Sequence, residues 1–546
     1  MQLYKQFCTE EFDNDNTLKS FKLKFEDNYN FGYDVLDQMA EKAPNDIALV
    51  WTNPEGEERI FTFADLSRLS NKAANVFLKY GIKKGDRVLL MLKRNYEYWY
   101  IVTALHKLGV VAIPATNMLT AEDISYRVNV ANIKMAVCTP DSDTVENILQ
   151  AKNKENSLKT VFVARKDFDG TVNITKEIES AGAELERVET KATDPMLIYF
   201  TSGTTGYPKA VVHNHIYSLC HIISAKYWQN VKEGGLHFSI AETGWAKASY
   251  GKIYGQWLCG CAVMAFDFEK FSPSKILKVI EKFKVTSFCA PPTAYRYFVK
   301  KGMQMYDLSS LEYLTTAGEA LNPIVAEAVY QQTGLHPMEG YGQSETTLLI
   351  ANLNGTHGKT GSIGKPSPMY DIRLVDSDGN EVKQGETGEI VVVPPKDRKQ
   401  YGIFTNYIGD EQMYQYAWRK GMYHTNDTAY MDEDGYYWYV GRADDLIKTR
   451  GYRVGPFEIE NVLMKHPAVL ECAVIGVPDE SRGQAIKAII KTVDGCDADK
   501  NLVNDIKVFS NKRLASYKWI QYIEFTDEMP KTISGKIKRV ALKANA

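Results

Sequence analysis

The sequence predicts an α/β protein: a large N-terminal domain of two stacked α/β sheets, a small β subdomain and a small α+β C-terminal domain. A chain of 546 residues is too long for one compact core, so two or more domains are expected. Short apolar runs alternate with amphipathic helical patterns over residues 87–163, and the alternation returns over residues 236–346. This is typical of parallel sheets with helices on both faces. Strand and turn signals over residues 361–393 predict the β subdomain.

The elements of the N-terminal domain follow from the spacing of apolar residues and from proline and glycine breaks. Helices are expected at residues 29–42, 63–80, 96–108, 214–227 and 275–284. Strands are expected at residues 48–51, 58–61, 87–92, 110–114, 136–138, 160–163, 262–266 and 287–290, with strands that run into glycine turns at residues 237–245, 314–320 and 338–346.

The remaining elements belong to the β subdomain and to the last hundred residues. Strands at residues 372–375 and 388–393 flank a polar turn, and residues 394–400 form a loop. Pro456 opens a helix, and strands are expected at residues 472–476, 485–491 and 520–525 with a helix at 502–514. We therefore place the domain boundary at 441/442, with an N-terminal domain of residues 1–441 and a C-terminal domain of residues 442–546.

Composition excludes several classes of protein. The chain is 44% apolar and 24% charged, which is ordinary for a soluble enzyme, and its net charge of −3 gives no support for nucleic-acid binding. No run of 18 apolar residues and no apolar signal core occur, so we expect no membrane span. The eight cysteines are scattered, and Cys259 and Cys261 form neither a disulfide framework nor a zinc set, which favours reduced thiols in a cytoplasmic protein. His213 and His215 lack a suitably spaced partner for a metal.

A Thr/Gly-rich stretch after an apolar run predicts a phosphate-binding loop. The apolar run is residues 197–200, and the hydroxyls and glycines that follow are Thr201, Ser202, Gly203, Thr204, Thr205 and Gly206. Amides and hydroxyls of such a loop can converge on phosphate oxygens, and Lys209 can add a positive charge. The loop is not a Walker A loop, because Tyr207 and Pro208 separate the glycine from the lysine. The alternative interpretation is a polar surface turn.

Two further glycine turns end predicted strands, where open α/β sheets bind their ligands. The first is residues 314–320 (LTTAGEA) and the second is residues 338–346 (MEGYGQSET). Tyr341, between two glycines, is suited to stack on a base, and Ser344 can reach a phosphate. Glu345 is a hard oxygen ligand suited to magnesium, although a lone exposed carboxylate would need no such role.

A second polar region follows at residues 424–460. Asp427 comes after a short strand and before a turn, and its carboxylate could accept both hydroxyls of a ribose or simply cap the turn. Arg442 could reach ribose or phosphate. The polar connector that follows it includes Asp444 and is suited to be a hinge. The chain then ends in a Lys/Arg-rich segment that includes Lys536, which on composition alone is a solvated end.

This ordered set of motifs resembles the adenylate-forming superfamily of acyl-CoA synthetases, peptide-synthetase adenylation domains and luciferases, with medium-chain acyl-CoA synthetases most similar. The resemblance covers nearly the whole chain after residue 25. It implies that Lys536 catalyses adenylation, that Glu345 holds Mg²⁺ and that Asp444 is the pivot of a mobile C-terminal lid. It also implies that ATP is bound by the phosphate loop with Lys209 and by Gly318, Glu319, Ala320, Glu339, Gly340, Tyr341, Gly342, Gln343, Ser344, Asp427, Arg442 and Arg453.

The resemblance also implies how the other substrates bind. Trp245 would line the acyl pocket, although simple packing is an equal alternative from the sequence. Acetate-specific relatives carry tryptophan at the position of Gly342, so glycine implies a deeper pocket and a longer acid. CoA would contact Lys448, Gly451, Tyr452, Arg482 and Trp519.

The implied activity is ATP-dependent conversion of a medium-chain or branched carboxylic acid to acyl-AMP and then, with CoA, to acyl-CoA. CoA rather than a tethered carrier is expected as acceptor, because Ala546 comes ten residues after Lys536 and residues 237–245 contain no aspartate for a substrate amine. Two alternatives stay open: an aryl-CoA ligase for benzoate-like acids and a non-catalytic nucleotide-binding relative. A homodimer is compatible with the sequence but not required by it.

Overall fold

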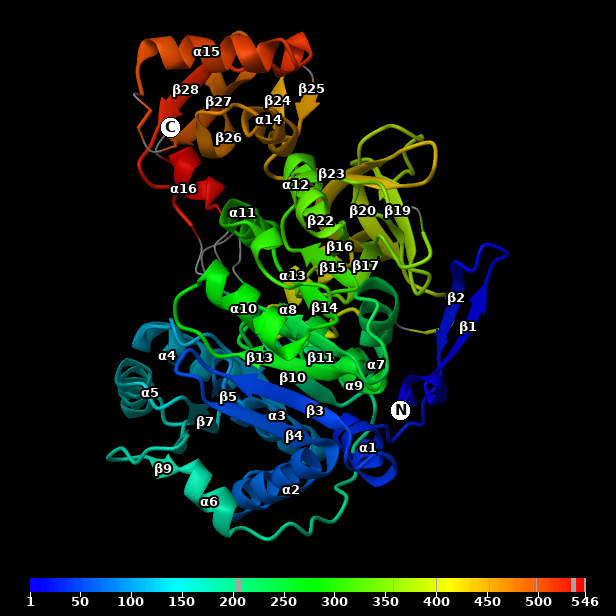
Figure 1. The fold of residues 1–546 in the computed structure, drawn as a ribbon, viewed down its shortest axis with the longest axis vertical. Coiled ribbons are helices and arrows are strands. Elements are labelled where there is room, and N and C mark those ends of the chain that lie inside the picture. The colour runs from blue at the N-terminus through cyan, green and yellow to red at the C-terminus, as the bar shows by residue number, and fades with distance from the viewer. Residues whose placement is uncertain are drawn as a thin grey trace. The chain divides into compact units, whose positions relative to one another are not determined.

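The computed structural model describes residues 1–201, 208–356, 358–398, 400–450, 452–493, 495–496, 498–531 and 537–544, and only the backbone of Ser142 and Arg453. The chain divides into two compact units, Met1–Asp371 with Pro394–Arg419 and Ile372–Val393 with Lys420–Ala546 (Figure 1). Each unit has its own sheets and its own buried apolar core. The predicted domain boundary at 441/442 falls inside the second unit and stays a prediction.

An eight-stranded sheet of the first unit has the order β21-β11-β10-β6-β5-β7-β8-β9. Its strands β5 to β9 and β10 are parallel, whereas β10, β11 and β21 pair antiparallel. Their bounds are β5 Arg87–Met91, β6 Val111–Pro114, β7 Met135–Cys138, β8 Thr160–Val163, β9 Val172–Asn173, β10 Pro195–Thr201, β11 Lys209–Asn214 and β21 Asn406–Tyr407.

A nine-stranded sheet of the same unit has the order β18-β17-β16-β15-β14-β12-β13-β3-β4. Its six central strands are parallel, as the alternation of strands and helices predicts. Their bounds are β3 Ile47–Thr52, β4 Glu58–Thr62, β12 Leu236–Ser239, β13 Ala262–Phe266, β14 Ser287–Cys289, β15 Tyr313–Ala317, β16 Pro337–Gly342, β17 Leu348–Ala351 and β18 Lys365–Pro366.

The helices of this unit begin where the sequence supplies a cap. Thr62 and Asp65 form a capping box at the start of α2 Phe63–Lys79. Proline occupies the first turn of α10 Pro273–Phe283, α11 Pro292–Lys301 and α12 Pro323–Thr333, which lie side by side (Figure 1). The other helices are α1 Gln38–Lys42, α3 Glu97–Lys107, α4 Ala121–Ala131, α5 Ser142–Lys154, α6 Ile174–Ser180, α7 Ile216–Ile222, α8 Lys247–Gly251, α9 Tyr254–Leu258 and α13 Glu411–Ala417.

Two of the predicted helices are partly π-helical. Residues Gly32–Asp37 precede α1, and Ile223–Trp228 continue α7. At the end of the second segment the Gln229 amide donates to the Ser224 carbonyl, five residues back, at 2.8 Å. Apolar spacing alone does not distinguish such a segment from an α-helix. A short hairpin, β1 Cys8–Phe12 and β2 Leu18–Leu23, precedes the region that resembles the family.

The second unit contains two antiparallel-rich sheets. One has the order β19-β20-β22-β23, and the other joins β25-β24-β27-β26 with β28 parallel to β27. The strands are β19 Asp371–Val375, β20 Gly388–Val393, β22 Tyr423–Met431, β23 Tyr437–Arg442, β24 Ile447–Thr449, β25 Tyr452–Val454, β26 Val469–Asp479, β27 Gly483–Thr492 and β28 Tyr522–Phe525. The helices are α14 Pro456–Leu463, α15 Lys500–Asn511 and α16 Arg539–Ala544. The fold is thus the predicted α/β class.

Candidate active site

The two ends of the predicted phosphate loop are held together by an antiparallel strand pair. Thr201, the last residue of β10, lies opposite Lys209, the first residue of β11. The Tyr126 hydroxyl donates to the Pro208 carbonyl at 3.0 Å. The predicted loop residues between them lie outside the described part of the chain: Ser202, Gly203, Thr204, Thr205 and Gly206.

Lys209 and Glu345, predicted to bind phosphate and metal, are brought together by a tyrosine. The Lys209 ammonium lies 5.6 Å from the centre of the Tyr407 ring, and the Tyr407 hydroxyl donates to Glu345 Oε1 at 3.0 Å. The Phe404 amide also donates to the Glu345 carbonyl at 2.7 Å. Sequence reasoning missed Tyr407, because it is 62 residues from Glu345 and no local spacing links them.

His213 supports the backbone of the Ser344 turn. Its ring is buried, and burial lowers its pKa from 6.5 to about 4, so the imidazole is neutral at neutral pH. Nε2 lies 2.7 Å from the Ser344 carbonyl, which can only accept, so Nε2 carries the proton. The ring also stacks on Tyr217 at 3.9 Å. His213 is therefore a structural support for the segment before Glu345.

The Gly318–Ala320 turn follows β15 and packs on a lysine of α8. Gly318 has φ of +99°, which favours glycine, and a Cβ there would lie 2.5 Å from Lys247 Nζ. That ammonium donates to the Ala317 carbonyl at 2.6 Å, and the Thr293 hydroxyl donates to Glu319 at 2.6 Å. The Glu319 side chain thus contacts the start of α11.

Glu339, which the resemblance places among the ATP-binding residues, is buried within β16. Its side chain is 4% exposed, and the Leu321 amide donates to Oε1 at 2.8 Å. Burial raises the pKa of this carboxyl from 4.5 to about 8, so it is protonated at neutral pH. The side chain joins β16 to the residue after Ala320, so any contact of this position with ATP would come from the backbone.

Gly342 does not face open space. A Cβ there would lie 2.7 Å from both the Tyr250 hydroxyl and the Thr347 carbonyl. The Tyr250 hydroxyl donates to the Thr346 carbonyl at 2.7 Å and lies 3.2 Å from the Gln343 carbonyl. The expectation that glycine alone deepens the acyl pocket is therefore incomplete, because a tyrosine from α8 occupies the adjoining space.

The other predicted residues of this region lie at strand ends or in loops. Trp245 is half-buried in the loop after β12 and donates its amide to the Glu242 carbonyl at 3.3 Å. A Cβ on Gly340 would lie 2.6 Å from the Trp228 ring. Tyr341 is half-buried, and the pairing of β16 with β17 shifts register between it and Gly342. This bulge redirects the chain toward Glu345.

Asp427 and Arg442 lie opposite each other on the paired strands β22 and β23. The prediction that Asp427 follows a strand is wrong: it lies inside β22, after Asn426 with φ of +56°. The Tyr439 hydroxyl donates to Asp427 Oδ1 at 3.1 Å, and Arg442 Nη1 lies 4.0 Å from the same oxygen. Burial lowers the pKa of Arg442, but the nearby carboxylates of Asp427 and Asp444 together raise it by more, so Arg442 keeps its positive charge.

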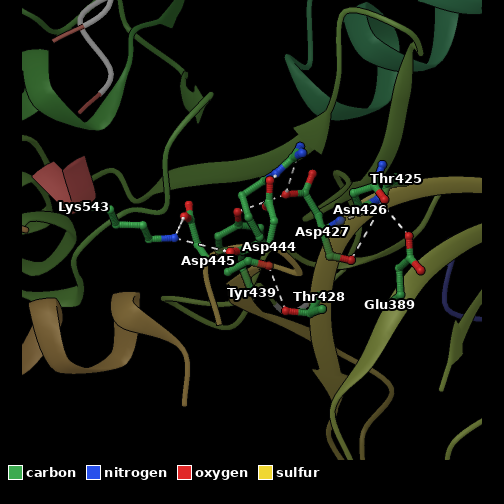
Figure 2. A network of polar contacts seen from close by, with 11 residues as sticks. Glu389, Thr425, Asn426, Asp427, Thr428, Tyr439, Asp444, Asp445 and Lys543 are labelled. Atoms are coloured by element: carbon green, nitrogen blue, oxygen red, sulfur yellow. Dashed lines mark hydrogen bonds and ion pairs between the residues drawn. The ribbon is translucent and has the colours of Figure 1, made fainter. Parts of the chain in front are cut away.

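The predicted hinge lies in the connector between β23 and β24. Arg442 Nε donates to Asp444 Oδ1 at 3.3 Å, and the Asp445 amide donates to the Arg442 carbonyl at 3.0 Å. Lys543 Nζ lies 3.3 Å from the Asp444 carbonyl and 2.8 Å from Asp445 Oδ1 (Figure 2). The connector is thus held by ion pairs rather than by a packed core.

Lys448, Tyr452 and Arg482, three of the residues predicted to contact CoA, lie at the β24–β25 turn or contact it. The Tyr452 ring is 52% exposed and stacks on Tyr517 at 4.3 Å. The Arg450 amide donates to the Arg482 carbonyl at 2.8 Å, and the Lys448 amide donates to Gln484 at 2.7 Å. Trp519 is exposed, with its indole N–H donating to the Asn511 and Leu514 carbonyls at 3.1 Å.

Three predicted residues outside the phosphate loop also cannot be placed. Lys536 and Gly451 lie outside the described residues, as does the side chain of Arg453. Among the described residues no group of three or more His, Cys, Asp or Glu side chains is arranged to hold a metal ion. A single carboxylate such as Glu345 still fits Mg²⁺, which usually takes one or two carboxylates together with phosphate oxygens.

Comparison with family models gives two matches in the order of the chain. Residues 36–401 match the model described as AMP-binding enzyme. Residues 458–536 match the model described as AMP-binding enzyme C-terminal domain. The matched segment ends at Lys536.

Curated relatives extend over nearly the full length. The chain is 37% identical to the human protein named acyl-coenzyme A synthetase ACSM3, mitochondrial, with 98% of this chain and 92% of that protein covered. It is 38% identical to 4-hydroxybutyrate–CoA ligase 1 of Metallosphaera sedula, with 94% and 90% covered.

A solved structure has the same fold. The anthranilate CoA ligase AuaEII in complex with anthranoyl-AMP is 28% identical, with a TM-score of 0.87 over 96% of this chain and 98% of that one. In the described residues, no helix combines the length and apolar character needed to cross a bilayer.

Proposed function

We propose that this chain, which belongs to the AMP-binding enzyme family and is an AMP-forming acid–CoA ligase, activates a medium-chain or branched carboxylic acid. ATP and CoA are its co-substrates. The acid first becomes acyl-AMP with release of pyrophosphate, and the acyl group then passes to the CoA thiol with release of AMP.

The observation that carries the proposal is the group formed by Lys209, Tyr407 and Glu345. It places a cation and a carboxylate on the same tyrosine, with the cation at the end of the phosphate loop. Phosphoryl and nucleotidyl transfer depend mainly on positioning and on neutralising charge at the phosphate oxygens. Such a pair is suited to do both.

We assign the first step as follows. The substrate carboxylate attacks the α-phosphorus of ATP in line with the leaving pyrophosphate, and the new bond is a mixed anhydride. The ammonium of Lys209 stabilises negative charge on the phosphate oxygens, and Lys536 adds a second ammonium, as the family resemblance implies. Mg²⁺ held by Glu345 and phosphate oxygens would supply further charge neutralisation when bound.

Asp427 and Arg442 are assigned to the nucleoside. The Asp427 carboxylate can accept hydrogen bonds from two ribose hydroxyls, and Tyr439 and Arg442 orient it from one side. Because Arg442 keeps its charge, it also reduces repulsion between this carboxylate and the phosphates.

In the second step the CoA thiol attacks the acyl carbon, and AMP leaves. We propose that Asp444 is the pivot of a lid motion that exchanges Lys536 for the surface around Tyr452 and Arg482. The connector suits this role, because it is held by individual ion pairs, of which the Arg442–Asp444 pair is largely exposed and so contributes little to stability.

Tyr250 is proposed to limit the depth of the acyl pocket. Its hydroxyl adjoins the place that a side chain at Gly342 would occupy, which is where acetate-specific relatives carry tryptophan. A tyrosine that reaches this space from α8 leaves more room than a tryptophan grafted on the turn itself. Acids longer than acetate are therefore favoured, up to the length at which the chain meets the ring.

An aryl acid is the second candidate. It is favoured by the likeness to a ligase solved with anthranoyl-AMP. The half-buried rings of Trp245 and Tyr250 would suit a planar substrate as well as an alkyl chain. A cytoplasmic location and a homodimer remain predictions, and relatives named as mitochondrial are a reason to test the first of these.

The test is turnover of a panel of acids from acetate to decanoate together with benzoate and anthranilate. AMP release is measured with and without CoA. We expect maximal CoA-dependent AMP release with acids longer than acetate, and release about 100- to 1000-fold slower from Glu345→Gln. Equal turnover of acetate and octanoate would contradict the pocket assignment, and preference for benzoate would select the aryl alternative.

A further inference from the structure

The outer face of α10 and α11 exposes two aromatic rings in contact. Phe271 is 39% exposed and Tyr297 is 53% exposed, and their ring centres lie 5.7 Å apart. Phe271 also contacts the buried Phe298, which anchors it to α11. Met305, 77% exposed, follows at the end of α11. Exposed apolar groups are ordinary singly, but contiguous ones mark interaction sites.

The same face is rich in basic residues. Residues 270–280 and 292–305 contain no Asp or Glu, and their basic residues are Lys270, Lys275, Lys278, Arg296, Lys300 and Lys301. All five lysines are exposed, and within the described chain none of them has an ion pair or a side-chain hydrogen bond. The whole chain carries a net charge of −3, so this concentration of positive charge is local.

The fold directs these side chains outward together. α10 and α11 each follow a parallel strand of the nine-stranded sheet and lie side by side, so both cover the same face of the sheet (Figure 1). Three acidic side chains of these and adjoining segments have other partners: Glu269 pairs with Lys93 at 3.4 Å, Glu281 accepts from the Asp307 amide at 2.8 Å and Glu327 accepts from Gln331 at 2.6 Å.

We propose that this face, defined by Phe271, Tyr297, Lys275, Lys278, Lys300 and Lys301, docks on the surface of an anionic lipid bilayer. Aromatic rings are favoured at the bilayer interface, and lysines extend flexible ammonium groups to anionic headgroups. Nucleic acid fits less well, because the two rings are inclined at 60° and present no common flat surface for bases.

Docking would give the enzyme access to acids that partition into membranes. α11 and α12 both begin beside the Gly318–Ala320 turn, since Thr293 of α11 contacts Glu319 and α12 starts at Pro323. The lipid-facing surface would therefore be continuous with the helices that border the active site. The lipid proposal does not depend on which acid is the substrate.

The experiment is co-sedimentation of the full chain with two kinds of vesicle, phosphatidylcholine alone and an equal mixture of phosphatidylcholine and phosphatidylglycerol. Binding is expected only to the anionic vesicles and should weaken as salt is added. Lys300→Gln with Lys301→Gln should weaken it about 25-fold, since each lysine near the surface contributes about fivefold. Adding Phe271→Ser and Tyr297→Ser to the two lysine changes should weaken vesicle binding more than the lysine changes alone.

The matched control is Lys154→Gln with Lys159→Gln, two exposed lysines at the end of α5 and in the loop after it. This pair should bind the anionic vesicles as the unmodified chain does. Absence of binding to anionic vesicles at low salt, equal binding to both vesicles, or equal loss in the two lysine pairs would each overturn the proposal. If the chain is retained on immobilised DNA and anionic vesicles do not displace it, the face binds nucleic acid instead.

Discussion

Replacement of Tyr250 by alanine should move the preference of the enzyme toward longer acids. The ring lies beside Gly342, and its hydroxyl donates to the Thr346 carbonyl. Loss of the ring admits about two or three further methylene groups, and each buried methylene contributes about 0.8 kcal/mol, about fourfold in kcat/KM. The ratio of kcat/KM for decanoate over hexanoate should therefore rise about 15- to 60-fold.

The assay is initial-rate AMP release at saturating ATP and CoA across straight-chain acids. Tyr250→Phe is the matched control: it keeps the ring, loses one buried hydrogen bond of about 1 kcal/mol and should keep the original preference. Tyr250→Ala also costs about 2–4 kcal/mol of stability, so a thermal unfolding scan is recorded to establish that the variant is folded at the assay temperature. An unchanged length ratio in folded Tyr250→Ala would refute the assignment of the pocket wall.

Three further predictions concern the carboxylates. Glu345→Gln should lower kcat for adenylation about 100- to 1000-fold, the loss typical of one charge-stabilising group, and added Mg²⁺ should not restore it. Asp427→Asn should raise KM for ATP about ten- to hundredfold, because a hydrogen bond to a charged acceptor contributes about 1.5–3 kcal/mol, whereas Tyr439→Phe should change it less. Glu339→Gln should change stability with pH: the folded pKa of about 8 lies above the ordinary 4.5, so the folded carboxyl holds its proton and the native chain loses stability as pH rises from 4.5 through 8. The variant lacks this loss, so its thermal midpoint should exceed that of the native chain more at pH 9 than at pH 5, and a constant difference would contradict the buried protonated carboxyl.

Most of the fold could be predicted from local pattern. Runs such as residues 88–91 are apolar throughout, as strands covered on both faces must be, and prolines such as Pro456 mark helix starts. The π-helical turn at Ile223–Trp228 could not be predicted, because it differs from an α-helix only in the hydrogen-bond partner of a few amides. The position of Asp427 inside a strand was not predicted, because asparagine is typical of turns. The strand nevertheless continues through Asn426, which adopts a left-handed conformation that the sequence does not show.

The site was predicted unevenly, for a physical reason. Each motif consists of residues that are close together in the sequence. Lys209 was therefore predicted from the phosphate-loop motif and Glu345 from the motif at residues 338–346. Their link through Tyr407 was not, since it depends on a strand pair formed far along the chain. A motif also does not show which of its side chains are buried: Glu339 stands among residues predicted to bind ATP, yet its side chain is buried in the protein.

Gly342 illustrates the same limit. Its small size indicates space, but the sequence does not say which residue shares that space. The structure identifies Tyr250, which is 92 positions away in the chain. Pocket depth is therefore a property of the packing and not of the motif.

We propose that one ammonium, that of Lys536, serves adenylation and not thioester formation. Lys536→Ala tests it with two half-reactions, acid-dependent exchange of pyrophosphate into ATP and thioester formation from supplied acyl-adenylate and CoA. The neighbouring Lys538→Ala is the control and should leave both unchanged. We predict that Lys536→Ala abolishes exchange and leaves thioester formation largely intact; an equal fall in the two half-reactions would contradict the account.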